Sequence, residues 1–133
     1  MSGYVADTHA LIWYLQDSKR LGPAARLAFT SAEEGLCYIY VPSMCLVELV
    51  LLEERGRMPA GTTEIVHQVL ASESNGLIVV PLTADVAKAV GAFSRNEIPD
   101  MPDRVIAATA VQLGLPLLTK DQVIQASSVD TVW

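Results

Sequence analysis

The chain has 133 residues, of which 51% are hydrophobic and 18% are charged, and its formal net charge at pH 7 is −6. This length and composition predict a single domain over residues 1–133 with a sizeable core, and they exclude a disordered chain. The acidic balance excludes a simple nucleic-acid coat protein, which would be basic, but it is compatible with an enzyme that holds cations among carboxylates.

Apolar strands alternate with helices along the whole sequence. In chain order the predicted elements are strand 3–6, helix 9–15, helix 23–34, strand 36–41, helix 43–55, helix 62–75, strand 77–82, helix 84–94, helix 101–114, strand 115–119 and strand 128–133. The strands are continuous apolar runs, which is typical of a sheet that is buried on both faces. The alternation therefore predicts an α/β fold with a mainly parallel central sheet and helices on both of its faces.

Several polar residues mark the ends of these helices. Asp7 or Thr8 is the expected cap of the first helix, and Pro23 suits the first turn of the second. Asp100 is the expected cap of the helix that carries Asp103 in its first turn. A helix cap that follows a strand marks where that strand ends. In open parallel sheets, ligands bind beyond the carboxyl ends of the strands.

No segment predicts a membrane span or a targeting signal. The longest apolar runs are about eight residues, whereas a span needs roughly 20. Residues 1–15 (MSGYVADTHALIWYL) have no basic segment ahead of their apolar part, so no signal peptide is expected. Cys37 and Cys45 show no metal-type spacing and are expected to be free thiols. We therefore expect a cytoplasmic protein with no membrane contact.

Glu48 is the one charged residue in the apolar stretch 45–52 (CLVELVLL). On a helix its nearest neighbours are Met44, Cys45, Leu51 and Leu52, so it does not face open solvent. An unpaired buried carboxylate costs several kcal/mol or more, so Glu48 must be paired, protonated or bound to a cation.

Three further acids are predicted near the same edge of the sheet. Asp7 and Asp121 each follow a predicted strand, and Asp103 lies at the positive end of a helix. If the two strands are neighbours, these side chains converge with that of Glu48 into an oxygen-rich site that suits Mg²⁺ or Mn²⁺.

Each acid also has a simpler interpretation. Asp7 and Asp100 are compatible with plain helix caps, Asp103 with a residue that only stabilises the helix dipole, and Asp121 with a turn residue. Glu48 is compatible with an ion pair to an arginine such as Arg55, two turns further on. The two histidines, His9 and His67, are interpreted as surface or partly packed residues. The phosphate-binding motifs GxxxxGK[ST] and GxGxxG, the GxSxG elbow and CxxC pairs do not occur in the sequence.

Four segments together make the chain resemble the PIN domains of the VapC type, the toxins of bacterial and archaeal toxin–antitoxin pairs. They are YVADTHALIWYL, PSMCLVELVLLEERGRM, IPDMPDRVIAATAVQLGLPLLTKDQVI and VDTVW, and they span nearly the whole sequence in the family's order. The first and third segments are the most specific. One departure is MPDR, where the family more usually has an aromatic residue before the acid, as in PFDR.

The resemblance implies a PIN-like α/β/α sandwich and a ribonuclease that uses Mg²⁺ or Mn²⁺ and is held inactive by a cognate antitoxin. By motif, the family's acidic quartet falls on Asp7, Glu48, Asp103 and Asp121, and Asp100 matches a frequent additional acid. Asp7 and Asp103 are expected to bind the metal directly, whereas Glu48 and Asp121 bind a second metal or hold its waters. The family commonly dimerises, so a homodimer is expected. The acidic surface also suits antitoxins of this family, which are often basic where they wrap the toxin.

Other polar side chains are weaker candidates. Thr8 and Thr119 flank two of the acids and either orient them through their hydroxyls or only cap and pack. Lys120 either contacts a phosphate or is an ordinary surface lysine. The candidates for an RNA-binding track, with ordinary surface charge as the alternative, are Lys19, Arg20, Arg55 and Arg57. The alternative function is a non-catalytic PIN-fold module that binds RNA or protein, against which retention of all four acids argues.

Overall fold

Five parallel strands form one sheet in which β1 (Gly3–Ala6) is central. In the computed structural model, which describes residues 2–133, the strand order is β3-β2-β1-β4-β5. The other strands are β2 (Tyr38–Pro42), β3 (Leu77–Val80), β4 (Leu117–Leu118) and β5 (Thr131–Val132). The chain winds outward from β1 through β2 to β3 and then returns to β4 on the other side of β1. The crevice beyond the ends of β1 and β4 is therefore the switch point at which such sheets bind ligands.

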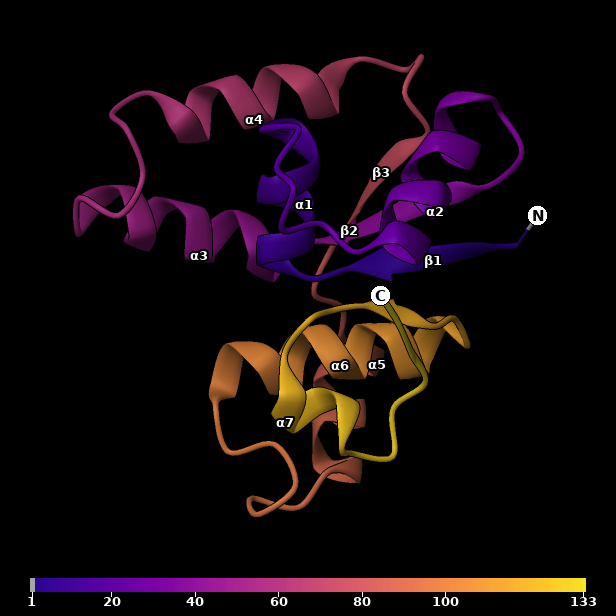
Figure 1. The fold of residues 1–133 in the computed structure, drawn as a ribbon. Coiled ribbons are helices and arrows are strands. Elements are labelled where there is room, and N and C mark those ends of the chain that lie inside the picture. The colour runs from indigo at the N-terminus through magenta and orange to yellow at the C-terminus, as the bar shows by residue number, and fades with distance from the viewer. Residues whose placement is uncertain (1) are drawn as a thin grey trace.

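Helices cover both faces of this sheet. They are α1 (Thr8–Leu15), α2 (Pro23–Glu33), α3 (Ser43–Glu54), α4 (Thr62–Ala71), α5 (Ala84–Ala89), the 3₁₀ helix η1 (Val90–Ala92), α6 (Met101–Leu113) and α7 (Gln122–Gln125). Figure 1 shows α1, α2 and α4 on one side of the strands and α5, α6 and α7 on the other. Helix α3 leaves the carboxyl end of β2 and packs against α1, α4 and α6. The predicted α/β/α sandwich is confirmed, and the described sheet is wholly parallel.

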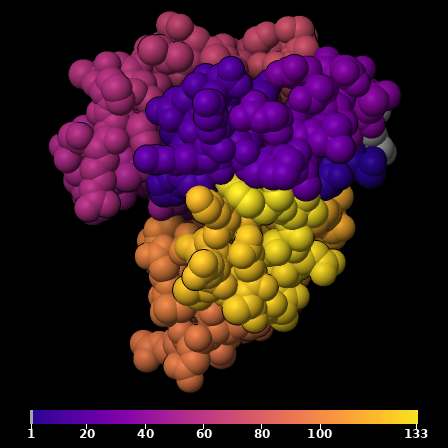
Figure 2. All heavy atoms as spheres, viewed as in Figure 1, coloured from indigo at the N-terminus to yellow at the C-terminus, as the bar shows by residue number. Residues whose placement is uncertain are grey.

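The central strands are buried on both faces. Val5 and Ala6 of β1 and Leu117 and Leu118 of β4 are fully enclosed, which explains why their sequence shows an apolar run and no alternation. The N-terminal and C-terminal parts of the chain pack directly against each other on one face of the molecule (Figure 2). In the part of the chain that the structure describes, no helix is long and apolar enough to cross a membrane.

Several predicted boundaries are wrong by a few residues. Helix α4 ends at Ala71, because Ser72 is extended and the Asn75 side chain closes the turn by binding the Val69 carbonyl and the Leu77 N–H. Helix α5 is also shorter than predicted and continues as η1. Strands β4 and β5 have two residues each, shorter than the runs 115–119 and 128–133.

Helix α7 was not predicted. Asp121 Oδ1 accepts hydrogen bonds from the N–H groups of Val123 (2.9 Å) and Ile124 (3.1 Å), and this capping closes a single helical turn. A turn of four residues is too short to produce a recognisable period in the sequence. The interpretation of Asp121 as a simple turn residue is therefore corrected, since it is a helix cap.

Candidate active site

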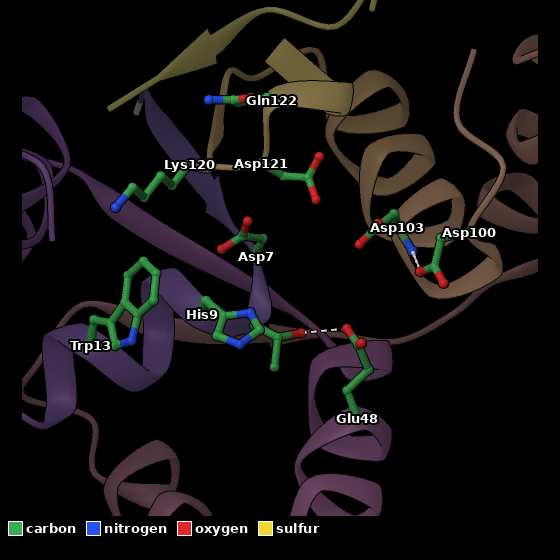
Figure 3. Close-up of a pocket in the computed structure, with 10 residues that line it drawn as sticks. Asp7, His9, Trp13, Glu48, Asp100, Asp103, Lys120, Asp121 and Gln122 are labelled. Atoms are coloured by element: carbon green, nitrogen blue, oxygen red, sulfur yellow. Dashed lines mark hydrogen bonds between the residues drawn. The ribbon is translucent and has the colours of Figure 1, made fainter. Parts of the chain in front are cut away.

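The acids predicted from the sequence surround one pocket at the carboxyl edge of the sheet. The pocket has a volume of about 530 Å³ and is lined by Asp7, Thr8, His9, Trp13, Glu48, Asp100, Asp103, Lys120, Asp121 and Gln122. Figure 3 shows the carboxylates of Asp7, Asp103 and Asp121 around its centre, with Glu48 reaching in from α3. Their side chains come from four separate parts of the chain, so only the fold brings them together.

Asp7 is the most enclosed of these acids, with 9% of its surface exposed. It follows β1 directly and caps α1, because its Oδ1 accepts a 2.8 Å hydrogen bond from the Ala10 N–H. Burial raises the pKa of Asp7 to about 6, although hydrogen bonds from Thr119 and Ala10 and the nearby His9 oppose this rise. The capping and functional interpretations of Asp7 are thus compatible, since one oxygen caps the helix and the carboxylate still faces the pocket.

Asp121 reaches the pocket because β4 lies beside β1. Val5 and Ala6 pair with Leu117 and Leu118, so the residues that follow both strands emerge at the same edge. The Asp121 N–H donates a 3.0 Å hydrogen bond to Thr119 Oγ1, and Thr119 is fully buried. The sequence predicted that Asp7 and Asp121 converge if the strands before them are neighbours, and β1 and β4 are neighbours in the sheet.

Asp103 and Asp100 lie in the first turn of α6. Asp100 caps this helix, and its Oδ2 accepts a 3.2 Å hydrogen bond from the Asp103 N–H. Asp103 is half-buried, and its pKa is raised to about 7, first by loss of hydration and then by repulsion from Asp100 and the other pocket acids Asp121, Glu48 and Asp7. Asp103 thus lies close enough to all four neighbouring acids to be affected by their charge.

Glu48 faces the pocket from the second turn of α3. Its Oε1 accepts a 2.6 Å hydrogen bond from the Thr8 hydroxyl, drawn as a dashed line in Figure 3. Glu48 does not pair with Arg55: across residues 2–133 the one ion pair joins Arg26 and Asp17. The expectation of a largely apolar setting was too strong, because Leu51 is 38% exposed and Glu48 itself is half-buried.

The pocket also contains residues that the sequence left outside the site. His9 is a surface residue, as expected, but it also lines the pocket. Trp13 and Gln122 were not considered, although Trp13 follows His9 by four residues and therefore shares its face of α1. This i, i+4 spacing directly after Asp7 is the signal that would have indicated them. Lys120 lines the pocket as well, while Arg55 and Arg57 do not.

The donor atoms suit a hard divalent cation. The acids offer carboxylate oxygens only, which Mg²⁺ and Mn²⁺ prefer, and their mutual repulsion is the kind that a cation relieves. Within residues 2–133, no three His, Cys, Asp or Glu side chains are arranged as a ready-made cage for an ion. Mg²⁺ in proteins usually keeps several of its own waters and takes few protein ligands.

Comparison with known proteins places the chain in a family. The model of the PIN domain matches residues 4–128, so the chain belongs to the PIN domain family. It is 30% identical over 122 residues to the ribonuclease VapC22 of Mycobacterium tuberculosis, covering 92% of this chain and 89% of that protein.

Two solved structures share the fold. One is a toxin–antitoxin complex from Klebsiella pneumoniae, with a TM-score of 0.68, 18% identity and coverage of 98% and 97% of the two chains. The other is VapC20 of Mycobacterium tuberculosis, described as a toxin that cleaves the sarcin–ricin loop, with a TM-score of 0.66, 17% identity and 98% coverage of each chain.

Proposed function

We propose that this protein is a ribonuclease toxin that cleaves RNA with the help of Mg²⁺ or Mn²⁺ and is neutralised by a cognate antitoxin. The observation that carries the proposal is the convergence of Asp7, Glu48, Asp103 and Asp121 on one pocket at the switch point of the sheet. The ribonuclease VapC22, which the chain matches over 89% of its length, supports the nuclease activity. The toxin–antitoxin complex among the structural neighbours supports the partner.

When bound in this pocket, Mg²⁺ or Mn²⁺ would activate water as the nucleophile and offset charge on the phosphate and the leaving oxygen. Asp7 and Asp103 would hold the cation, because they are the pocket acids whose pKa values are raised by loss of hydration, and a bound cation offsets that cost. Asp7 is oriented by the Ala10 N–H and the Thr119 side chain, and Glu48 by the Thr8 hydroxyl. These contacts hold the carboxylates in place and leave their free oxygens toward the pocket.

Glu48, Asp121 and Asp100 have a different part in the proposal. Their side chains are more exposed than that of Asp7. Glu48 and Asp121 would orient the attacking water or hold a second ion. Asp100 would position Asp103, since it caps the turn that carries it.

The remaining expectations stay predictions. They are a single domain over residues 1–133, a homodimer, a cytoplasmic location and a basic contact surface on the antitoxin. The net charge of −6 supports the last of these, because charge complementarity speeds association.

The test is cleavage of total RNA by the purified protein, freed of antitoxin, over a series of Mg²⁺ and Mn²⁺ concentrations. Asp7→Asn should lose cleavage, because asparagine keeps the helix cap but removes the charge. Asp85→Asn, which changes an exposed acid of α5 outside the pocket, should cleave as the wild type does. Cleavage that survives both Asp7→Asn and EDTA would overturn the metal-site proposal. Divalent-cation binding without cleavage of any RNA would support the non-catalytic module.

A further inference from the structure

One end of the pocket is built from aromatic and basic side chains. His9 and Trp13 share a face of α1, with ring centroids 5.4 Å apart. The ammonium nitrogen of Lys120 lies 5.7 Å from the centroid of the Trp13 ring, and the guanidinium carbon of Arg20 lies 6.0 Å from it. We call these four residues the aromatic–basic cluster. They come from α1, from the loop that follows it and from the loop after β4.

Trp13 and Lys120 line the end of the pocket that lies away from Asp100 and Asp103, with Asp7 and Asp121 between them. Figure 3 shows Trp13 and Lys120 on one side of Asp7, and Asp100 and Asp103 on the other. Among the pocket-lining residues, Lys120 and His9 are the basic side chains. A polyanion that crosses the acidic end therefore finds its nearest favourable charge at the end that carries Trp13.

Trp13 is held in place at the pocket without being a core residue. Trp13 and its neighbour Tyr14 are both half-buried, but Tyr14 stacks on the core residue Phe29 with ring centroids 4.1 Å apart, whereas Trp13 lines the pocket. The ring of Trp133 lies against Trp13 at 5.8 Å with an interplanar angle of 67°, and the Trp133 carbonyl accepts a 3.0 Å hydrogen bond from the Ala25 N–H. The indole of Trp13 is thus supported by Trp133, which follows β5 and is itself held by α2, while it still lines the pocket.

We propose that the aromatic–basic cluster binds one nucleotide of single-stranded RNA beside the phosphate that is cleaved. The base stacks on the indole of Trp13, and Lys120 and Arg20 move from the ring to the adjoining phosphates. This inference rests on the proposed ribonuclease function. Aromatic rings paired with basic side chains are a recurring way to bind single strands, since every base has a face that can stack. A base held in a duplex is not free to stack in this way, so the subsite selects unpaired RNA.

Trp13 can be observed directly in a binding experiment. The sequence has two tryptophans, so Trp133→Phe leaves Trp13 as the one indole. We would add Asp7→Asn to prevent cleavage and titrate this protein, in Mg²⁺, with a mixed-sequence RNA of roughly 12 nucleotides, within the length range of known single-strand sites. A second titration uses an abasic ribose–phosphate oligomer of the same length. RNA should change the Trp13 emission and bind about 5- to 150-fold more tightly than the abasic oligomer, as expected for one stacked base.

Substitution of Trp13 separates stacking from charge. In the Asp7→Asn protein, Trp13→Leu should bind RNA and the abasic oligomer with equal affinity, and Trp13→Phe should keep an intermediate preference. Unchanged Trp13 emission at saturating RNA would overturn the proposal. An undiminished preference for RNA in Trp13→Leu would overturn it as well. The emission experiment needs no change at Trp13, so it decides the matter even where Trp13→Leu folds poorly.

Lys120 provides an independent measurement. Lys120→Gln should weaken binding of both oligomers alike. It should also lower the slope of the logarithm of the binding constant against the logarithm of salt concentration by roughly 0.7 in magnitude, the value for one phosphate contact to a single strand. Lys88→Gln, which changes an exposed lysine of α5 away from the pocket, should leave both unchanged. An unaltered salt dependence in Lys120→Gln would contradict the phosphate contact.

The two proposals fail in different ways. A wild-type protein that cleaves RNA but whose Trp13 does not respond to it would overturn only the subsite. A protein whose Trp13 binds RNA but that cleaves none at any divalent-cation concentration would overturn only the ribonuclease.

Discussion

The Thr8 hydroxyl donates a 2.6 Å hydrogen bond to Oε1 of Glu48, and this contact joins the start of α1 to α3 across the pocket. The residues are 40 positions apart in the chain. Both helices begin at the carboxyl ends of neighbouring strands, β1 and β2, so their first turns converge. The contact leaves Glu48 one oriented oxygen and a second one free for a cation or water.

Thr8→Val should therefore weaken the site while preserving its shape. Valine has nearly the same volume but no hydroxyl, so Glu48 loses its orienting contact. Loss of such an orienting partner typically costs about 10- to 100-fold in metal affinity or activity. The measurement is the Mg²⁺ concentration needed for half-maximal RNA cleavage. Thr8→Ser keeps the hydroxyl and should stay close to the wild type; equal losses in both variants would contradict an orienting role.

Stability without divalent cations should fall as the pH rises from about 4 to about 7. The pKa values of Asp7 and Asp103 are raised in the folded protein to about 6 and about 7, above the ordinary value of 3.8. The folded state therefore holds more protons than the unfolded state in this window, and the free energy of unfolding decreases with pH. Urea unfolding at several pH values measures the effect.

Two variants and one addition test the cause of this pH dependence. Asp103→Asn should flatten the profile, whereas Asp85→Asn, outside the pocket, should leave it unchanged. Mg²⁺ added near pH 7 should raise stability, because it binds the folded state alone. A profile that rises between pH 4 and 7 in the wild type would contradict the raised pKa values.

Arg104→Met should destabilise the protein by about 1–3 kcal/mol. The Arg104 guanidinium donates hydrogen bonds to the carbonyls of Val90 (3.1 Å) and Phe93 (2.8 Å), which fastens η1 to the first turn of α6. Methionine keeps the packed stem but leaves the Phe93 carbonyl without this partner, and the Val90 carbonyl with only the 3.4 Å hydrogen bond from the Phe93 N–H. The buried Nε of Arg104 has no partner, so removing it offsets part of this loss. Urea unfolding measures the change, and Arg95→Met, at an exposed arginine, is the control.

Arg104→Met should also reduce cleavage, because Asp103 precedes Arg104 on the same turn of α6. Unfolding midpoints that coincide for Arg104→Met and the wild type would contradict the anchoring role.

Gly22→Ala should disturb the support of Trp13. A Cβ at this position would lie 2.1 Å from the carbonyl oxygen of Trp133, so that residue must move. Overpacking of this kind costs about 1–3 kcal/mol. We expect a lower unfolding temperature together with altered tryptophan emission in the folded state. A Cβ at Gly91 would meet no atom within 4 Å, so Gly91→Ala should change neither the unfolding temperature nor the emission. If Gly22→Ala also left both at their wild-type values, Trp133 would not be held tightly in place.

Local signals in the sequence determined most of the elements. Asp7 and Asp100 were expected as helix caps, and each accepts a hydrogen bond from the first turn of its helix. Continuous apolar runs indicated parallel strands that are covered on both faces, which holds for the central strands β1 and β4. In the edge strand β3 the same pattern misled, since Ile78 and Val79 are each 38% exposed. Helix α7 escaped this reasoning, since one capped turn depends on a single side chain, Asp121.

The sequence by itself determined which acids stand after strands and at helix starts, and hence the oxygen-rich character of the site. Only the tertiary structure decided that Asp7 and Asp121 share one pocket, because the pairing of β1 with β4 joins residues over 110 positions apart. It also decided that Glu48 meets Thr8 and does not pair with Arg55, and that Trp13 faces the acids. Caps and periodicity depend on neighbours within a few residues, whereas a pocket depends on which strands lie side by side, and that follows from the packing of the whole core.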